Sequence, residues 1–168
     1  LHQEGRHAEA LRELLARARA TDNFSAYMSL CRWRKKIEAV PQGMARVEDL
    51  RIAILGGSTT DFLELPLKLE LETLGRASTV FCADFNNYVP ELLEANSKAA
   101  AFRPNVAVVL VTPHNIADWP AVGDSPEVVQ ALVERVSDHW LGLCETFHGH
   151  TNCEIVLSNL HLLATRVV

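Results

Sequence analysis

The sequence predicts an α/β domain, a three-layer doubly wound parallel sheet of about four strands behind an N-terminal helical hairpin. Up to about residue 40, apolar residues recur every three or four positions, which is typical of amphipathic helices. From residue 50, short apolar runs alternate with helical patterns, which is typical of β-α-β units. The composition agrees, because 168 residues that are 48% hydrophobic and 22% charged can bury a core.

The first element is a helical hairpin, which we assign to a unit of its own over residues 1–43. Residues 7–20 carry one apolar stripe, and residues 21–23 end this helix and cap the next one. The second helix is predicted over 24–37, with an exit marked by Pro and Gly in residues 41–43. An alternative is a helical-repeat interaction module, although no second copy recurs at a fixed period.

The α/β domain is predicted over residues 44–168. We expect its C-terminal end to be cut short and the chain to be a fragment of a longer protein, because most sheets of this kind have a fifth strand. Right-handed crossovers favour a central first strand, with a ligand crevice at the carboxyl ends of the first and third strands. The strands are predicted at residues 51–55, 78–82, 106–111 and 154–158, and the helices at residues 62–74, 91–102 and 126–147.

Charge, hydropathy and cysteine content narrow the class of protein. The net charge is −5, but residues 1–50 hold nine Lys and Arg against seven Asp and Glu. The basic run at residues 32–36 is either the solvated face of a helix or a phosphate site, and the acidic remainder argues against nucleic acid. No apolar run is long enough for a bilayer. Four scattered cysteines and no leader segment predict a cytoplasmic protein with reduced thiols.

The segment over residues 52–61, which reads Ile-Ala-Ile-Leu-Gly-Gly-Ser-Thr-Thr-Asp, is the most informative part of the chain. It lacks the lysine of a P-loop and the G-x-G-x-x-G spacing, so support for nucleotide binding is weak. A strand followed by this turn raises the Ser58 hydroxyl at the sheet edge, where it is a candidate nucleophile. Gly57 and Thr59 flank it as candidate ligand-binding residues. The alternative is a plain strand-helix turn in which a hydroxyl caps the helix.

A nucleophilic serine needs a base and donors for an oxyanion. His114 follows the third predicted strand and His161 follows the fourth, so both are candidate bases. Asn115 is a candidate oxyanion donor. The loop acids Asp84 and Asp118 are available partners for a histidine, although loops also gather Asp for reasons of turn geometry.

A cluster near the end of the last predicted helix contains zinc-competent side chains. Cys144 and His148 are four residues apart on one helical face, and His150 and Cys153 follow. Their spacing matches no standard finger or ribbon. We therefore expect no metal here, with these four residues as the candidates should one bind.

Three segments resemble the N-terminal region of FkbH-like proteins of HAD subfamily IIIC: residues 50–61, 84–88 and 101–106. The hairpin also resembles the lead-in of longer members. The resemblance implies an SGNH-hydrolase-like (GDSL-type) or flavodoxin-like domain, followed by a HAD phosphatase-like domain. Some members of this family make a glyceryl thioester on an acyl carrier protein from a glycolytic phosphate, for polyketide or related natural-product biosynthesis.

The resemblance also implies residue roles and departures from the family pattern. Ser58 occupies the nucleophile position of the SGNH pattern, with Gly57 where Asp is usual. Asn86 lies where glycine is common, near the oxyanion glycine, and Asn115 lies near the SGNH asparagine. The closing D-x-x-H block has no match, since residues 158–161 provide a His without the Asp, and the HAD signature D-x-D-x-T is absent.

The resulting expectation is an accessory domain of an FkbH-like protein that loads a glyceryl or related acyl unit from a phosphorylated precursor onto an acyl carrier protein. Whether this domain is itself an enzyme stays open, while the parent is expected to be a phosphatase or glyceryl transferase. The alternative is an SGNH-type serine esterase or acyltransferase. Expected partners are the carrier, docked on the basic run, and an acyl or phosphoglyceryl molecule. No cofactor is expected in this fragment, and Mg²⁺ is expected in a following HAD domain.

Overall fold

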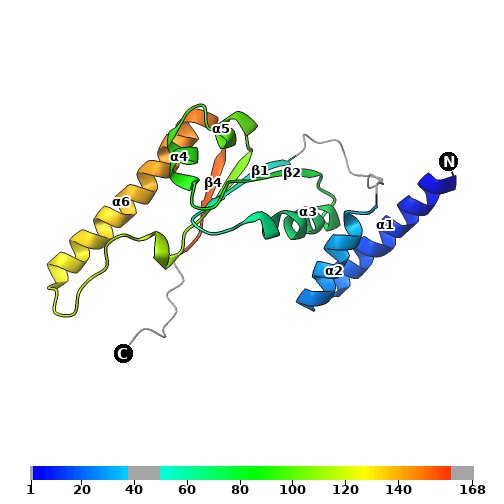
Figure 1. Ribbon diagram of the computed structural model, residues 1–168, viewed down its shortest axis with the longest axis horizontal. Coiled ribbons are helices and arrows are strands. Elements are labelled where there is room, and N and C mark those ends of the chain that lie inside the picture. Colours follow the sequence, from blue (N-terminus) through cyan, green and yellow to red (C-terminus); the bar gives the residue numbers. More distant parts are fainter. Residues whose placement is uncertain (1, 38–49, 160–168) are drawn as a thin grey trace. The chain divides into compact units, whose positions relative to one another are not determined.

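The computed structural model describes the backbone of residues 2–37 and 50–159 (Figure 1). Side chains are described from residue 6 onward within these ranges. Strands and helices alternate after residue 50, which confirms the predicted α/β class. The elements are α1 (His2–Ala20), α2 (Phe24–Arg34), β1 (Leu50–Gly56), the 3-10 helix η1 (Asp61–Leu63), α3 (Glu64–Thr73), β2 (Ser78–Cys82), α4 (Tyr88–Leu93), α5 (Lys98–Phe102), β3 (Val106–Leu110), the 3-10 helix η2 (Pro113–Asn115), α6 (Pro126–Thr151) and β4 (Glu154–Leu157).

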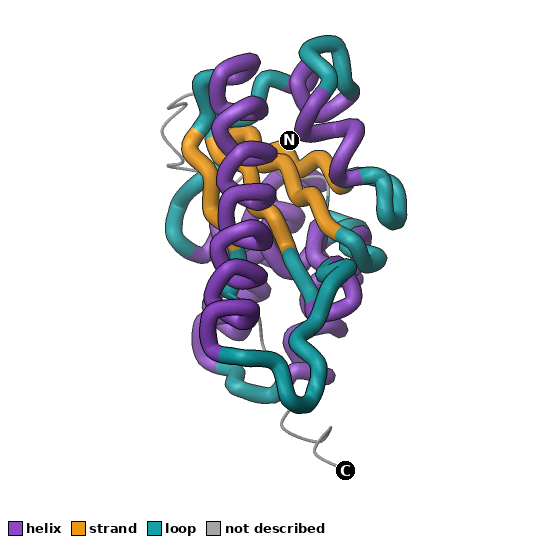
Figure 2. The backbone as a smooth tube through the Cα atoms, turned by 90° about the vertical axis from the view of Figure 1, so that its left-hand side faces the viewer, coloured by secondary structure: helices purple, strands orange, loops and turns teal. Residues whose placement is uncertain are grey.

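The strands form one sheet in the order β2-β1-β3-β4 (Figure 2). β1 pairs with β3 in parallel, with Ile52 opposite Val106, and β3 pairs with β4 in parallel, with Val106 opposite Glu154. The chain passes from β1 to an edge strand and then returns past β1 to β3. This reversal is the mark of a doubly wound sheet, and it makes the carboxyl ends of β1 and β3 the topological switch point.

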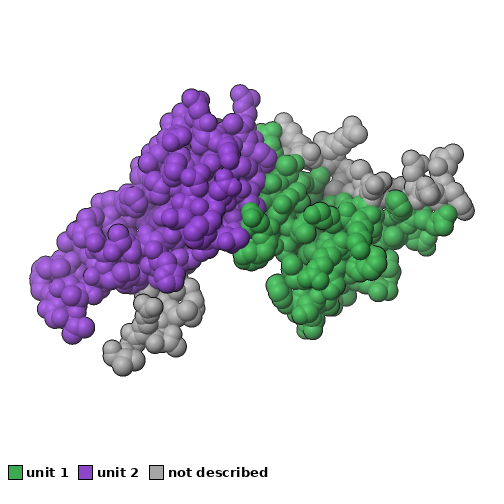
Figure 3. Space-filling model, viewed as in Figure 1, with its two compact units in different colours: residues 1–51, 61–80 green, residues 52–60, 81–168 purple. Residues whose placement is uncertain are grey.

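The chain divides into two compact units (Figure 3). One comprises residues 1–51 and 61–80, and the other comprises residues 52–60 and 81–168. The first unit therefore contains the hairpin together with α3, and the second contains most of the sheet together with α4, α5 and α6. Within the described residues, no helix is both long enough and apolar enough to cross a membrane.

In the first unit, the hairpin packs on α3 around a small apolar cluster. Polar contacts add to it: the Tyr27 hydroxyl donates to Glu70 Oε2 at 2.9 Å, and Arg19 donates to the Thr73 carbonyl. Arg34 forms a two-point ion pair with Glu72, with N···O distances of 2.5 and 2.7 Å. The buried residues of the cluster are Leu14, Ala18, Cys31 and Leu69.

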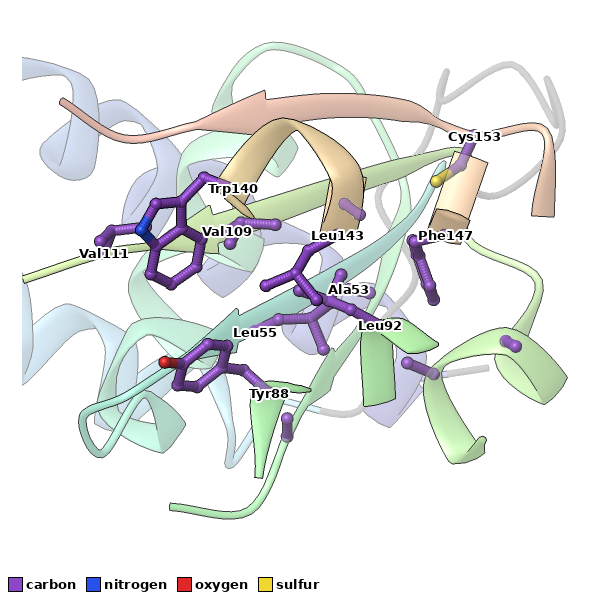
Figure 4. Close-up of a cluster of buried hydrophobic side chains, with 14 residues drawn as sticks. Ala53, Leu55, Tyr88, Leu92, Val109, Val111, Trp140, Leu143, Phe147 and Cys153 are labelled. Carbon is purple, nitrogen blue, oxygen red and sulfur yellow. The ribbon is translucent and has the colours of Figure 1, made fainter. Parts of the chain in front are cut away.

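The core of the second unit lies between one face of the sheet and helices α4, α5 and α6 (Figure 4). Every second residue of β1 and β3 points into it, as pleating requires. Phe147 of α6 is fully buried, and the Trp140 ring stacks on Tyr88 with centroids 5.4 Å apart and an interplanar angle of 17°. The strand residues in this core are Ala53, Leu55, Ala107 and Val109.

The single helix predicted over residues 91–102 is wrong, because the chain forms two short helices there, α4 and α5. Ser97 begins the second one: its hydroxyl accepts from Ala100 N at 3.1 Å and donates to Glu91 O at 2.8 Å. The Glu91 side chain is buried and accepts from Ala99 N at 2.7 Å. These side-chain bonds satisfy backbone groups that a continuous helix would otherwise pair, so the helix is interrupted.

The end of α3 was predicted correctly, whereas α6 is longer than predicted. Gly75 follows α3 with φ +76°, as expected of a residue just past a helix end. Helix α6 extends to Thr151, beyond the predicted end at Phe147, and stops where Asn152 takes the left-handed conformation with φ 55°.

Candidate functional site

The turn after β1 presents Ser58 at the switch point of the sheet. β1 ends at Gly56, where a Cβ atom would lie 3.0 Å from the Leu110 carbonyl oxygen, so glycine allows β1 and β3 to approach closely. Ser58 and Thr59 are exposed on the turn. Within residues 2–37 and 50–159, no hydrogen bond of the Ser58 hydroxyl is seen, and the side chain is exposed there.

The Asn115 carboxamide lies directly against this turn. A Cβ atom built on Gly57 would lie 1.7 Å from Asn115 Nδ2 and 2.5 Å from Asn115 Cγ. Only glycine fits here, because any side chain at this position would overlap the carboxamide. The structure therefore places side by side three of the residues that the sequence singled out: Gly57, Ser58 and Asn115.

The orientation of the carboxamide is fixed by Thr112. Asn115 Oδ1 accepts from the Thr112 backbone N–H at 2.9 Å and from Thr112 Oγ1 at 2.8 Å. A backbone N–H can only donate, so the atom facing it is the oxygen. The Asn115 NH₂ group therefore faces Gly57, and it presents donors toward the Ser58 turn.

Tyr88 lies in segment 84–88, which carries part of the resemblance, but its side chain was not among the predicted site residues. It is buried in α4, and its ring stacks on Trp140. Burial raises the pKa of Tyr88, and the Asn115 side chain offsets part of that rise.

The loop after β2 carries Asn86, which is exposed and has φ 55°. This left-handed conformation favours glycine and asparagine. Asp84, in the same loop, forms an exposed ion pair with Lys98 at 3.2 Å.

Among the described residues, no carboxylate is bonded to His114, the candidate base that lies in this part of the chain. His114 lies in η2 next to Asn115, is exposed, and has no carboxylate partner in that part of the chain. Asp118 pairs instead with Arg135 at 3.7 Å, with both side chains exposed. His161 falls outside the described residues.

Near the end of α6, the side chains of His148, His150 and Cys153 form hydrogen bonds with other residues of the fold. His148 Nδ1 lies 2.8 Å from the Cys153 carbonyl oxygen, and His150 Nε2 lies 3.2 Å from the Leu93 carbonyl oxygen. The buried Cys153 thiol accepts from Thr151, and burial raises the pKa of the Cys144 thiol. In the part of the chain that the structure describes, no three His, Cys, Asp or Glu side chains are grouped so as to hold a metal ion.

No protein-family model matches the sequence, and no curated protein matches it. A solved structure is similar: the crystal structure of the N-terminal part of the protein BF1531 from Bacteroides fragilis, which contains a phosphatase domain and is complexed with Mg. The TM-score is 0.57 at 17% sequence identity, and the match covers 75% of this chain. This chain spans only 32% of the length of that one. At this identity, the similarity shows a shared fold.

Proposed function

We propose that this chain is the N-terminal accessory domain of a longer FkbH-like protein, in which a HAD phosphatase-like domain supplies the transfer chemistry and binds Mg²⁺. Two findings support the proposal. The fold is similar to the N-terminal part of a protein that contains a phosphatase domain, of which this chain spans 32%. The segments over residues 50–61, 84–88 and 101–106 resemble that family. In this proposal, the protein transfers a glyceryl or related acyl unit to an acyl carrier protein during natural-product biosynthesis.

The observation that carries the role of this domain is the contact between Gly57 and the oriented Asn115 carboxamide. An amide N–H and the exposed Ser58 hydroxyl at one sheet edge can donate to the oxygens of an acyl or phosphoglyceryl group. His114 has no carboxylate partner among the described residues, and such a donor set without an oriented base suits binding rather than turnover. We infer that this domain holds the acyl group while the reaction proceeds elsewhere in the protein.

The carrier is proposed to dock on the end of α2. Arg32, Lys35 and Lys36 are exposed there, and Lys36 Nζ lies 4.7 Å from the centre of the exposed Trp33 ring. Arg34, which belongs to the same basic run, is held by its ion pair with Glu72. Carrier proteins are acidic, so three exposed cations around an aromatic ring offer a surface of complementary charge.

Reversing the charge of Arg32, Lys35 and Lys36 to Glu in the full chain is expected to raise the Kd for the acyl carrier protein at least about tenfold. The loss should shrink at high ionic strength, because salt screens exposed charges. Titration of a fluorescently labelled carrier, followed by anisotropy at low and high salt, measures both effects.

A matched variant separates local docking from net charge. Arg6, Arg12 and Arg76 are exposed in the same unit, and their reversal to Glu changes the net charge by the same amount. We expect this control to bind the carrier with at most about a twofold change in Kd. Equal weakening by both triple variants, or by neither, would contradict docking at the end of α2.

A second candidate function is an SGNH-type serine esterase or acyltransferase. It is favoured by the exposed Ser58 hydroxyl on the turn that the Asn115 amide contacts, which is the pairing of nucleophile and oxyanion donor that acyl transfer uses. In this alternative, Ser58 Oγ attacks the acyl carbonyl, His114 or His161 takes the hydroxyl proton, and the alcohol or thiol leaves with that proton.

A fluorophosphonate probe decides between the two functions. A catalytic Ser58 would displace fluoride from phosphorus, forming a phosphonyl-serine that intact-protein mass spectrometry detects. For the accessory role, we expect no adduct on the folded chain after prolonged incubation. An adduct that is lost in Ser58→Ala but kept in Ser25→Ala, which changes an exposed serine of α2, would instead establish the serine enzyme.

A further inference from the structure

We propose that the Thr60 hydroxyl is a further ligand-binding group of this site, and that it bonds a carboxylate or carbonyl oxygen of the ligand's acyl end rather than a phosphate. The identity of the ligand rests on the proposed function. The assignment of Thr60 rests on its burial, its unpaired hydroxyl and its place at the ends of β1 and β3.

Thr60 carries a buried hydroxyl that lacks a partner. The residue ends the turn over residues 57–60 and is 2% exposed, whereas Ser58 and Thr59 are exposed. Within the described part of the chain, Thr60 Oγ1 is shielded from solvent and has no hydrogen-bond partner. Such groups are rare in folded proteins, because burying an unpaired hydroxyl destabilises the fold. Valine has the same β-branched shape without the hydroxyl, so packing alone does not explain a threonine here.

The Thr60 side chain lies where β1 and β3 end. A Cβ atom built on Gly56 would lie 3.5 Å from Thr60 Cγ2 and 3.0 Å from the Leu110 carbonyl oxygen. The Thr60 carbonyl accepts from Cys82 Sγ at 3.8 Å, which ties the residue to the end of β2. These contacts hold Thr60 at the switch point of the sheet, where ligands of doubly wound folds bind.

The groups gathered at this edge are neutral hydrogen-bond donors. The Asn115 NH₂ group abuts Gly57, and the Ser58 hydroxyl is exposed on the same turn. The two segments that meet here, residues 56–60 and 111–115, contain no lysine or arginine. Proteins commonly bind phosphate through arginine or lysine, whereas hydroxyl and amide donors suit a carbonyl or carboxylate oxygen. We therefore assign the site to the acyl end of the ligand.

Binding brings the ligand oxygen to Thr60 by displacing the outer part of the turn. Ser58 and Thr59 are exposed, so moving them breaks few buried contacts. The Thr60 hydroxyl then gains a partner, and the free energy lost by burying it unpaired is recovered in the complex. The consequence is a pair of opposite effects: removing the hydroxyl stabilises the ligand-free chain and weakens the complex.

Thr60→Val tests both effects in the full chain. We expect the urea midpoint of the ligand-free variant to rise by at least about 0.5 M, because an unpaired buried hydroxyl is removed. The Kd for D-glycerate, followed by the Gly57 and Ser58 amide signals in ¹⁵N-resolved spectra, should rise at least about tenfold. A midpoint at or below that of wild type would mean that the hydroxyl is already paired in the free protein, and it would overturn the inference.

Two further variants separate the hydroxyl from changes of shape and of stability. Thr60→Ser keeps the hydroxyl and loses the methyl group, so its Kd should stay within about threefold of wild type. Ser78→Ala removes another buried hydroxyl that has no partner among the described residues, in the first unit. It should raise the urea midpoint and leave the Kd unchanged. Equal weakening of binding in Thr60→Ser and Thr60→Val overturns the assignment of the hydroxyl.

A second probe distinguishes failure of this inference from failure of the proposed function. Glycerol 3-phosphate has a phosphate and no acyl group, so it should bind at least about tenfold more weakly than D-glycerate. If D-glycerate binds wild type and Thr60→Val equally, the assignment of Thr60 is wrong and the acyl-holding role stands. If D-glycerate does not bind wild type, the acyl-holding role fails, and the role of Thr60 fails with it. Equal affinity for the two probes contradicts the choice of an acyl oxygen over a phosphate.

Discussion

Gly57→Ala is expected to abolish ligand binding at the Ser58 turn, because the new methyl group would occupy the position of the Asn115 carboxamide. A Cβ there would lie 1.7 Å from Asn115 Nδ2, 2.5 Å from Cγ and 2.7 Å from Oδ1. The carboxamide cannot yield cheaply, since Thr112 holds its oxygen by two hydrogen bonds. Either Asn115 leaves its place or the turn shifts, and both outcomes remove the donor from Ser58.

The expected size of the effect follows from overpacking. We expect Gly57→Ala to lower the free energy of unfolding by about 1–3 kcal/mol, as inserted methyl groups do in packed regions. Binding of D-glycerate, used as a small probe for the proposed acyl ligand, should fall below detection, and the Asn115 side-chain amide signals should move from their wild-type positions. Urea unfolding and the ¹⁵N-resolved spectrum of the full chain measure the two effects.

Gly142→Ala is the control, because it is expected to raise the free energy of unfolding that Gly57→Ala lowers. Gly142 lies within α6, and a Cβ built on it meets no atom within 4 Å. Gly142→Ala should therefore stabilise the chain by up to about 1 kcal/mol, because alanine favours a helix over glycine. If Gly57→Ala leaves the Asn115 signals and glycerate binding as in wild type, then the close contact between the turn and η2 does not exist in solution.

The sequence was sufficient for the sheet and for the edge of the sheet at which Ser58 and Asn115 lie. Each strand is a local signal, because an apolar run such as Val106–Leu110 can be recognised from its own residues. Because parallel strands end at a common edge, residues following β1 and β3 are brought together whatever the details of packing. Ser58 and Asn115 could thus be placed at one edge from order alone, although their roles stay proposals.

The parts that could not be predicted depend on contacts between residues far apart in sequence. Tyr88 stacks on Trp140 of α6, and the residues around either ring in the sequence do not predict this contact. Arg34 is indistinguishable in sequence from the other members of its basic run, yet Glu72, 38 residues away, pairs with it. The helix break before Ser97 is a local effect, but it depends on a buried Glu91 carboxylate that polarity alone would place at the surface.

The choice between the accessory role and the serine enzyme also depends on side-chain contacts that the sequence does not reveal. The sequence offers seven histidines, and their proximity to a strand end is a weak guide to catalysis. The described structure shows His114 exposed next to Asn115, without a carboxylate to orient its ring. Orientation of the base distinguishes an acyl-transfer enzyme from a binding site with similar donors, and it is set by side-chain geometry that a pattern of residue types does not contain.

Trp140→Ala is expected to destabilise the chain more than the replacement of either other tryptophan. Trp140 is 5% exposed, and its ring stacks on Tyr88 with centroids 5.4 Å apart. Truncating a buried aromatic side chain in a core costs about 3–5 kcal/mol. That loss is comparable with the whole stability of many domains of this size, so the urea midpoint should fall sharply, as followed by circular dichroism.

The other two tryptophans of the chain are the matched controls. Trp33 is 60% exposed and Trp119 is 48% exposed, so replacing either with alanine should change the free energy of unfolding by no more than about 0.5 kcal/mol. Trp140→Phe keeps an aromatic ring against Tyr88 and should recover part of the loss. A loss in Trp33→Ala or Trp119→Ala as large as the loss in Trp140→Ala would contradict this prediction.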